Sequence, residues 1–127
     1  MSDPTYVLLY VDDPSASATF YTNLLDRAPV EVSPTFALFL LGSGLKLGLW
    51  SRHTVEPAAT GAAAGACELG FPVADATAVE ALYADWRRRG LRMAQSPTPM
   101  DFGHTFVALD PDGHRLRVFA PSVPAAA

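Results

Sequence analysis

The sequence has a single cysteine, Cys67, and no long run of apolar residues. One thiol can form neither an internal disulfide nor, by itself, a thiolate metal site. The apolar residues around Cys67 predict a buried, unreactive thiol. A membrane-spanning helix needs about 20 consecutive apolar residues, and no stretch of this chain approaches that length. We therefore expect a soluble protein without a membrane partner.

Basic residues are also few. The chain has nine Lys and Arg residues and 13 Asp and Glu residues, which gives a formal net charge of −4 and an isoelectric point near 5.1. The only basic cluster, residues 87–89, falls where a helix is predicted to end, and the helix dipole favours positive charge there. This balance argues against nucleic acid as a partner. Because residues 1–5 contain neither a basic segment nor an apolar one, we expect a cytoplasmic protein.

The 127 residues, half of them apolar, are enough for one ordinary domain with a hydrophobic core. Residues 5–11 alternate as a strand that is apolar on both faces, which predicts burial on both sides. A helix is expected to begin at Asp13-Pro14 and to end near Asp26, because Asp caps free amides and Pro is tolerated in the first turn. Short strands are predicted at 27–32, 35–41 and 45–51.

The second half repeats this order. A strand at 67–73 precedes a helix at 75–89, which Gly90 stops, and a short strand follows at 91–95. Residues 96–103 are predicted as a loop because they contain two prolines and a glycine. The two halves overlay with Asp13 on Asp75 and Leu47 on Arg117, which indicates repeats 5–51 and 67–120 joined by a Pro-, Gly- and Ala-rich linker, 52–66, within one domain.

The stretch from Phe106 to Phe119 predicts two strands joined by a tight turn at Asp110-Pro111-Asp112-Gly113, in which Pro presets φ and Gly accepts a positive φ. After the turn, Arg115 and Arg117 alternate with apolar residues. Two interpretations of the arginine face stay open: a solvated surface, or the lining of a pocket.

Two segments carry a resemblance to a known family. Val11-Asp12-Asp13-Pro14 leads into a helix with Phe20-Tyr21, and residues 102–116 read Phe-Gly-His-Thr-Phe-Val-Ala-Leu-Asp-Pro-Asp-Gly-His-Arg-Leu. In these segments the chain resembles the vicinal oxygen chelate (VOC) superfamily, which includes glyoxalase I, bleomycin resistance proteins and extradiol dioxygenases. The resemblance implies an α+β fold of two β-α-β-β-β modules with cupped sheets, paired as a homodimer, with ligands bound inside the cups.

Enzymes of this family hold a divalent metal on the first and last strands of each half. Carried over by the resemblance, those positions are Tyr6, Leu47, Glu68 and Arg117. Only Glu68 is a plausible ligand, because Leu has no lone pair, a neutral Tyr binds metals poorly and Arg is a permanent cation. We therefore expect neither a metal nor another cofactor, and instead a direct Glu68–Arg117 ion pair at the metal position.

Strand alternation and the family's cup together predict a lined cavity of mostly aromatic and aliphatic side chains, as in a pocket for a flat apolar molecule. For Leu8, Leu38 and Leu49, simple core filling is an equal alternative. Strict alternation places Trp50 opposite Leu47 and Leu49, so whether it faces the cup or the core stays open. His104 borders the predicted loop. The candidate ligand-binding residues are Tyr6, Leu8, Tyr10, Leu38, Leu47, Leu49, Trp50, Glu68, Phe102, His104, Arg117 and Phe119.

Two functions remain. The first is metal-independent sequestration of a small hydrophobic aromatic compound, of the antibiotic-resistance type, which the missing metal ligands favour. The second is a metal-dependent lyase or isomerase of the glyoxalase kind, or a dioxygenase. The enzyme would require other metal ligands or a strand register shifted by one residue, and such a shift exchanges the two faces of a strand. No residue motif predicts a catalytic nucleophile.

Overall fold

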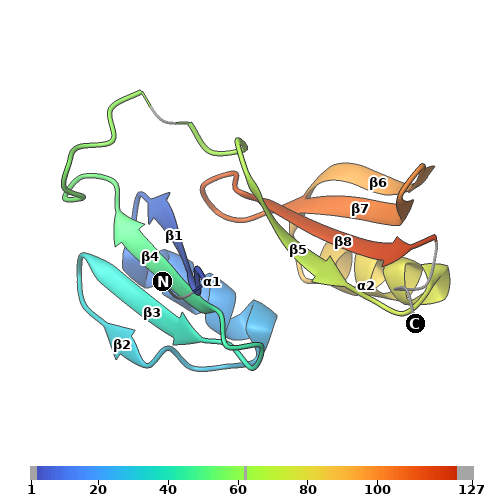
Figure 1. The fold of residues 1–127 in the computed structure, drawn as a ribbon, viewed down its shortest axis with the longest axis horizontal. Helices are drawn as coiled ribbons and strands as arrows, with labels where there is room; N and C mark the ends of the chain where they lie inside the picture. Colours follow the sequence, from blue (N-terminus) through green and yellow to red (C-terminus); the bar gives the residue numbers. More distant parts are fainter. Residues whose placement is uncertain (1–2, 62, 123–127) are drawn as a thin grey trace. The chain divides into compact units, whose positions relative to one another are not determined.

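The computed structural model describes residues 3–61 and 63–122. Two modules of β-α-β-β-β follow one another (Figure 1), so the predicted α+β class and module order are confirmed. The first contains β1 (Tyr6–Val11), α1 (Pro14–Leu25), β2 (Glu31–Val32), β3 (Phe36–Leu40) and β4 (Lys46–Ser51). The second contains β5 (Glu68–Pro72), α2 (Ala76–Arg88), β6 (Arg92–Met100), β7 (Gly103–Leu109) and β8 (Arg115–Pro121).

Each module is a compact unit with its own four-stranded sheet, and the boundary between the units lies at Ala62–Ala63, inside the predicted linker. The strand orders are β1-β4-β3-β2 and β5-β8-β7-β6. In both sheets the first pair is parallel and the others are antiparallel. None of the described helices is long and apolar enough to cross a membrane.

Helix α1 begins and ends through local chemistry that the sequence contains. The Asp13 carboxylate accepts hydrogen bonds from the backbone N–H groups of Ser15 and Ala16 at 3.0 and 3.4 Å, and Pro14 occupies the first turn. Asp26 then adopts a left-handed conformation with φ 51°, which a short polar side chain tolerates better than most. Helix α1 packs against β3 and β4 and leaves the other face of its sheet uncovered.

One face of each sheet packs on its helix and forms a separate core. In the first unit Val11, Phe39 and Leu49 are fully buried, with Tyr21 of α1 stacked edge-on against Phe39. In the second unit Phe106 lies beneath Tyr83 and Trp86 of α2, with ring centroids 5.4 Å apart in both pairs. Burying an aromatic side chain of this size stabilises a fold by about 1.5–3 kcal/mol, so these rings anchor each sheet to its helix.

The predicted turn between β7 and β8 forms and is held by Asp110. This carboxylate is buried and accepts hydrogen bonds from the backbone N–H groups of Asp112 at 2.9 Å and His114 at 2.8 Å. Gly113 has φ 93°, the conformation for which Gly was expected. The turn fixes the direction in which β8 presents its arginines.

Three sequence-based expectations are wrong. Strand β6 continues through residues 96–100, which were predicted as a loop, because an edge strand with register irregularities tolerates proline. Strand β2 comprises only Glu31–Val32 instead of residues 27–32. Cys67 is exposed, since it precedes β5 and no core residue covers it.

Candidate ligand-binding site

The sheet face of the first unit that α1 leaves uncovered is strongly apolar. Tyr6, Leu8 and Tyr10 alternate along β1 as predicted and point to this face. Their exposed fractions are 57%, 43% and 38%, so the predicted burial on both sides of β1 is absent. An exposed row of large apolar side chains is typical of a binding surface.

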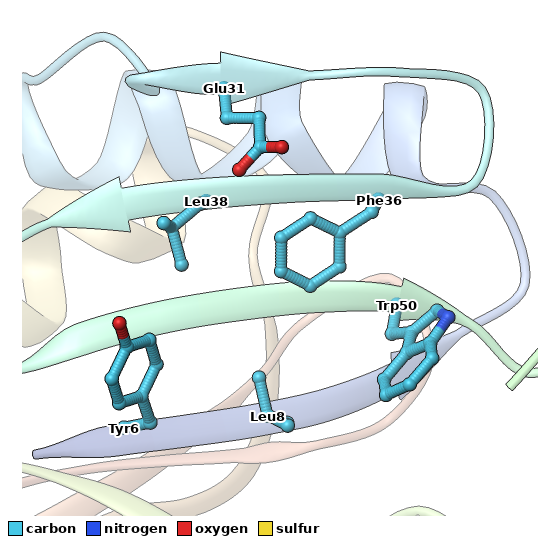
Figure 2. A pocket seen from close by; sticks show the side chains of 6 residues that line it. All are labelled: Tyr6, Leu8, Glu31, Phe36, Leu38 and Trp50. Atoms are coloured by element: carbon cyan, nitrogen blue, oxygen red, sulfur yellow. The ribbon is translucent and has the colours of Figure 1, made fainter. Parts of the chain in front are cut away.

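This face contains a hollow of about 500 Å³ (Figure 2). That volume lies within the range of small-molecule sites in proteins, about 300–1,000 Å³. Strands β1, β2, β3 and β4 all contribute to its lining. The lining residues are Tyr6, Leu8, Glu31, Phe36, Leu38 and Trp50.

Aromatic rings form one end of the hollow. The Trp50 ring meets Phe36 at 6.2 Å between centroids and Tyr10 at 6.5 Å, both edge to face. Gly48 is paired with Leu8 and Leu38. A side chain there would meet Leu8 and Phe36, because a Cβ would lie 2.5 Å from Leu8 Cδ2 and 3.1 Å from the Phe36 ring. The absence of a side chain at Gly48 therefore lets Leu8 and Phe36 lie close against the sheet.

The placement of Leu47 and Leu49 in the cup is wrong. Both are buried on the α1 side of the sheet, at 1% and 0% exposure. Leu8 is paired with Gly48 and Tyr10 with Trp50, so it is the even-numbered residues of β4 that share the face of Tyr6. The open question about Trp50 is thereby answered, because it lies on the uncovered face with Leu38.

The same register corrects the overlay of the halves by one residue. Tyr6 is paired with Lys46, and Glu68 with Arg115, so Gly48 and not Leu47 corresponds to Arg117. The aromatic face of the first sheet and the arginine face of the second are thus equivalent surfaces. The positions that resemble the family's metal ligands are Tyr6, Gly48, Glu68 and Arg117.

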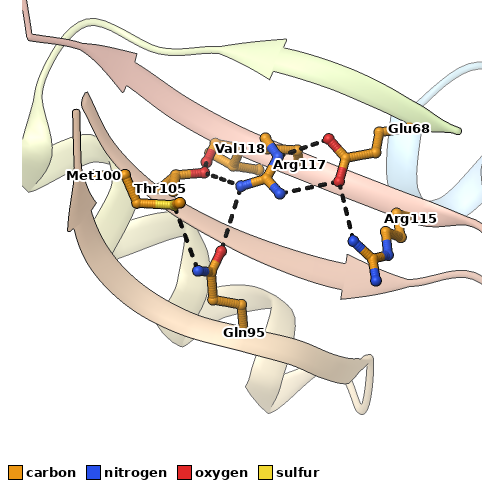
Figure 3. Close-up of polar contacts among 7 residues, drawn as sticks. All are labelled: Glu68, Gln95, Met100, Thr105, Arg115, Arg117 and Val118. Atoms are coloured by element: carbon orange, nitrogen blue, oxygen red, sulfur yellow. Dashed lines mark hydrogen bonds and ion pairs between the residues drawn. The ribbon is translucent and has the colours of Figure 1, made fainter. Parts of the chain in front are cut away.

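The second sheet carries the expected ion pair (Figure 3). Arg117 Nε donates to Glu68 Oε1 at 2.7 Å and a terminal nitrogen donates to Oε2 at 3.0 Å, a bidentate arrangement. The other terminal nitrogen donates to Gln95 Oε1 at 3.3 Å and Thr105 Oγ1 at 3.2 Å. Arg115 lies 3.6 Å from the same carboxylate. All three guanidinium nitrogens of Arg117 therefore donate hydrogen bonds to residues of the second sheet. This geometry argues against a solvated Arg117 and against a guanidinium that is free to bind a ligand.

The arginine hydrogen bonds hold the pKa of the Glu68 carboxyl below its usual range, although partial burial opposes this effect. Phe102 lies over the guanidinium at 5.7 Å from ring centroid to Arg117 Cζ and meets Phe119 at 6.4 Å. Both predicted aromatic residues thus lie beside the ion pair. This part of the sheet is a closed polar cluster flanked by rings.

His104 lies away from both the hollow and the polar cluster. Its Nε2 is 2.7 Å from Glu80 Oε2 of α2, so the side chain faces the helix and not the uncovered face. The assignment of His104 to the pocket lining is wrong, because its side chain lies on the side of β7 that faces α2. His104 fixes α2 to β7 instead.

The side chains present do not fit a divalent metal. Among residues 3–61 and 63–122, no three His, Cys, Asp or Glu side chains gather in one group. Glu68 alone of the four family positions has a suitable oxygen, and both of its oxygens accept hydrogen bonds from Arg117.

Sequence reasoning missed Glu31 and Phe36, which line the hollow. Phe36 could have been found, since it alternates with Leu38 along a strand that was predicted. Glu31 had no such signal, because β2 is only two residues long and its pairing with Leu38 depends on the tertiary fold.

Comparisons with known proteins agree with this geometry. A family model described as Glyoxalase/Bleomycin resistance protein/Dioxygenase superfamily matches residues 4–118. The phenazine antibiotic resistance protein EhpR of Enterobacter agglomerans is 29% identical over 118 residues, which cover 91% of this chain and 89% of EhpR.

Solved structures share the fold. The solution structure of protein ATC0852 from Agrobacterium tumefaciens is 52% identical with a TM-score of 0.88, and the match covers 97% of this chain and all of that one. A glyoxalase-related enzyme from Fulvimarina pelagi is 23% identical with a TM-score of 0.82, covering all of this chain and 94% of that one. The second likeness concerns the fold alone.

Proposed function

Because this chain belongs to the Glyoxalase/Bleomycin resistance protein/Dioxygenase superfamily, we propose that it binds and sequesters a small, flat, hydrophobic aromatic compound without a metal. The site is the hollow on the uncovered face of the first sheet. Binding encloses the compound among aromatic and aliphatic side chains and leaves it chemically unchanged.

The observation that carries this proposal is the shape and chemistry of the hollow. Six residues line about 500 Å³, and three of them are Tyr6, Phe36 and Trp50. Flat rings gain both apolar burial and edge or face contacts from such a lining, the latter worth about 0.5–1.5 kcal/mol for each aromatic pair. Gly48 adds no side chain to this surface, so Leu8 and Phe36 lie close against the strand.

The name of EhpR supports the class of compound. That protein is called a phenazine antibiotic resistance protein, and it covers 91% of this chain at 29% identity. A phenazine is a flat tricyclic aromatic compound, which is the kind of ligand that the hollow favours on physical grounds. We therefore choose phenazine itself as the first probe.

The position of the two tryptophans allows a sharp experiment. Trp50 lines the hollow, whereas Trp86 is 4% exposed and packs from α2 against Phe106 in the other unit. Phenazine should quench part of the tryptophan emission of the wild-type protein and raise its melting temperature. A ligand that binds only the folded state adds about 2.7 kcal/mol at 100 times its dissociation constant.

Trp50→Phe supplies the matched control. This variant keeps an aromatic ring in the hollow but leaves Trp86 as the only tryptophan, so the quenching should disappear while the thermal shift is reduced and not lost. Unchanged emission and melting temperature in the wild type at saturating phenazine, and with a panel of other planar heterocycles, would rule out the proposal. So would turnover of the probe by protein loaded with Ni, Zn, Fe or Mn at one ion per chain.

A further inference from the structure

We propose that Glu31 makes the hollow selective for aromatic compounds that carry a positive charge. This inference rests on the proposed function and specifies the class of ligand. Glu31 is the only charged residue among the six that line the hollow, and the other five present rings or aliphatic groups. A single carboxylate beside three aromatic rings is a combination that favours a flat organic cation.

The geometry directs the carboxylate into the hollow. Glu31 lies on the edge strand β2, paired with Leu38 of β3. Figure 2 shows its side chain pointing from β2 toward β3, the strand that carries Leu38 and Phe36. Within residues 3–61 and 63–122 no ion pair engages this carboxylate, whereas Glu68, Asp85 and Asp12 all have arginine partners.

The aromatic part of the lining acts in the same direction. The faces of Tyr and Trp rings carry partial negative charge and attract cations within about 6 Å of their centroids. Lys46 of β4 is a cation on the same face, and its Nζ lies 4.9 Å from the Tyr6 centroid. Lys46 does not line the hollow, so it opposes Glu31 only from outside.

The electrostatic contribution of Glu31 is modest because the residue is exposed. Ion pairs between exposed groups and cation–π contacts at exposed sites change affinity by between about two- and fivefold each. Together they predict that a cation binds about four- to twenty-five-fold more tightly than a neutral ring system of the same shape. An anion of that shape should bind more weakly than the neutral compound.

The test uses one ring system at three charges. Phenazine is neutral, 5-methylphenazinium carries one positive charge, and phenazine-1-carboxylate carries one negative charge at neutral pH. The samples are kept in the dark before each measurement. Dissociation constants are then obtained from the quenching of Trp50 emission at low and at high salt. In the wild type we expect the cation to bind most tightly and the carboxylate least tightly, with the difference shrinking at high salt.

Glu31→Gln keeps the size of the side chain and removes its charge. In this variant the cation should lose about two- to fivefold in affinity, because only the ion pair is removed and the ring contacts remain. The carboxylate should gain affinity, and neutral phenazine should change less than about twofold. Asp26→Asn is the matched control, because it removes the same charge from the end of α1, on the opposite side of the sheet, and should leave all three constants unchanged.

The outcomes separate this inference from the proposed function. Equal binding of the three compounds, tighter binding of the carboxylate, or a charge preference that Glu31→Gln leaves intact would overturn the inference while the hollow remains a binding site. Failure of all three compounds to quench Trp50 would overturn both. A preference lost equally in Asp26→Asn would show that net charge, and not Glu31, causes it.

Discussion

Breaking the Glu68–Arg117 pair should destabilise the second unit, and the loss should be specific to the pair. We consider Glu68→Gln, Arg117→Met and the double change, because Gln and Met keep most of the side-chain volume. In the double variant neither charge remains to be compensated. The difference between its effect and the sum of the single effects gives the interaction energy of the two residues.

The structure sets the size of this energy. Fully exposed ion pairs contribute about 0.2–1 kcal/mol, and hydrogen bonds to charged groups about 1.5–3 kcal/mol when they are shielded from water. The side chains of Arg117 and Glu68 are 20% and 31% exposed and are joined by two hydrogen bonds. We expect a coupling energy of about 2 kcal/mol. Arg115 limits this energy, because it still compensates part of the charge of Glu68 when Arg117 is removed.

Urea unfolding followed by tryptophan emission measures this coupling. The four proteins are made in the Trp50→Phe background, so that Trp86, which is buried in the same unit as the pair, is the only reporter. Midpoints should fall in both single variants without a change in the slope of free energy against urea. A coupling below about 0.5 kcal/mol would contradict the view that the pair is a closed structural cluster.

The same cycle has a pH dependence of known sign. The pKa of Glu68 is lowered below its ordinary value of 4.5 by the hydrogen bonds from Arg117. A carboxyl whose pKa is lower in the folded state stabilises the fold above the unfolded pKa. The coupling should therefore be constant above about pH 5 and vanish as the pH falls through the lowered pKa of Glu68. A coupling that is unchanged once the Glu68 carboxyl is protonated would show that the charge of Glu68 is not its source.

The fold was predictable because its signals are local. The cap at Asp13, the turn at residues 110–113 and the stop at Gly90 depend on residues close in the chain, and each lies where the sequence indicated. The end of β6 was not predictable in this way. Proline normally breaks a strand, and only the position of β6 at the edge of its sheet makes residues 96–100 acceptable.

The site was predictable where strand parity alone decides it. Tyr6, Leu8 and Tyr10 share a face because successive side chains alternate. The error at Leu47 and Leu49 arose between strands, since an overlay of two weakly similar halves cannot distinguish a shift of one residue, and one residue exchanges the faces. The Glu68–Arg117 pair survived this error because both residues lie in the same half and on the same face.

Two further predictions concern the uncovered faces. We propose that the protein is a homodimer, because open sheet edges and the exposed row of Tyr6, Leu8 and Tyr10 favour contact with a second copy of the chain. Light scattering at micromolar concentration should give twice the mass of the chain, and the monomer mass would contradict the proposal. The last prediction is that Gly48→Val abolishes phenazine binding. A side chain at Gly48 would displace Leu8, which is 43% exposed, and would press on the Phe36 ring, so the fold should lose about 1–3 kcal/mol while the hollow fills. Gly70→Ala on the second sheet is the control, since its Cβ would meet the Phe119 ring at 3.3 Å without touching the hollow, and it should bind phenazine as the wild type does. If Gly48→Val binds phenazine with wild-type affinity while Trp86 emission shows that the protein is folded, the ligand binds elsewhere.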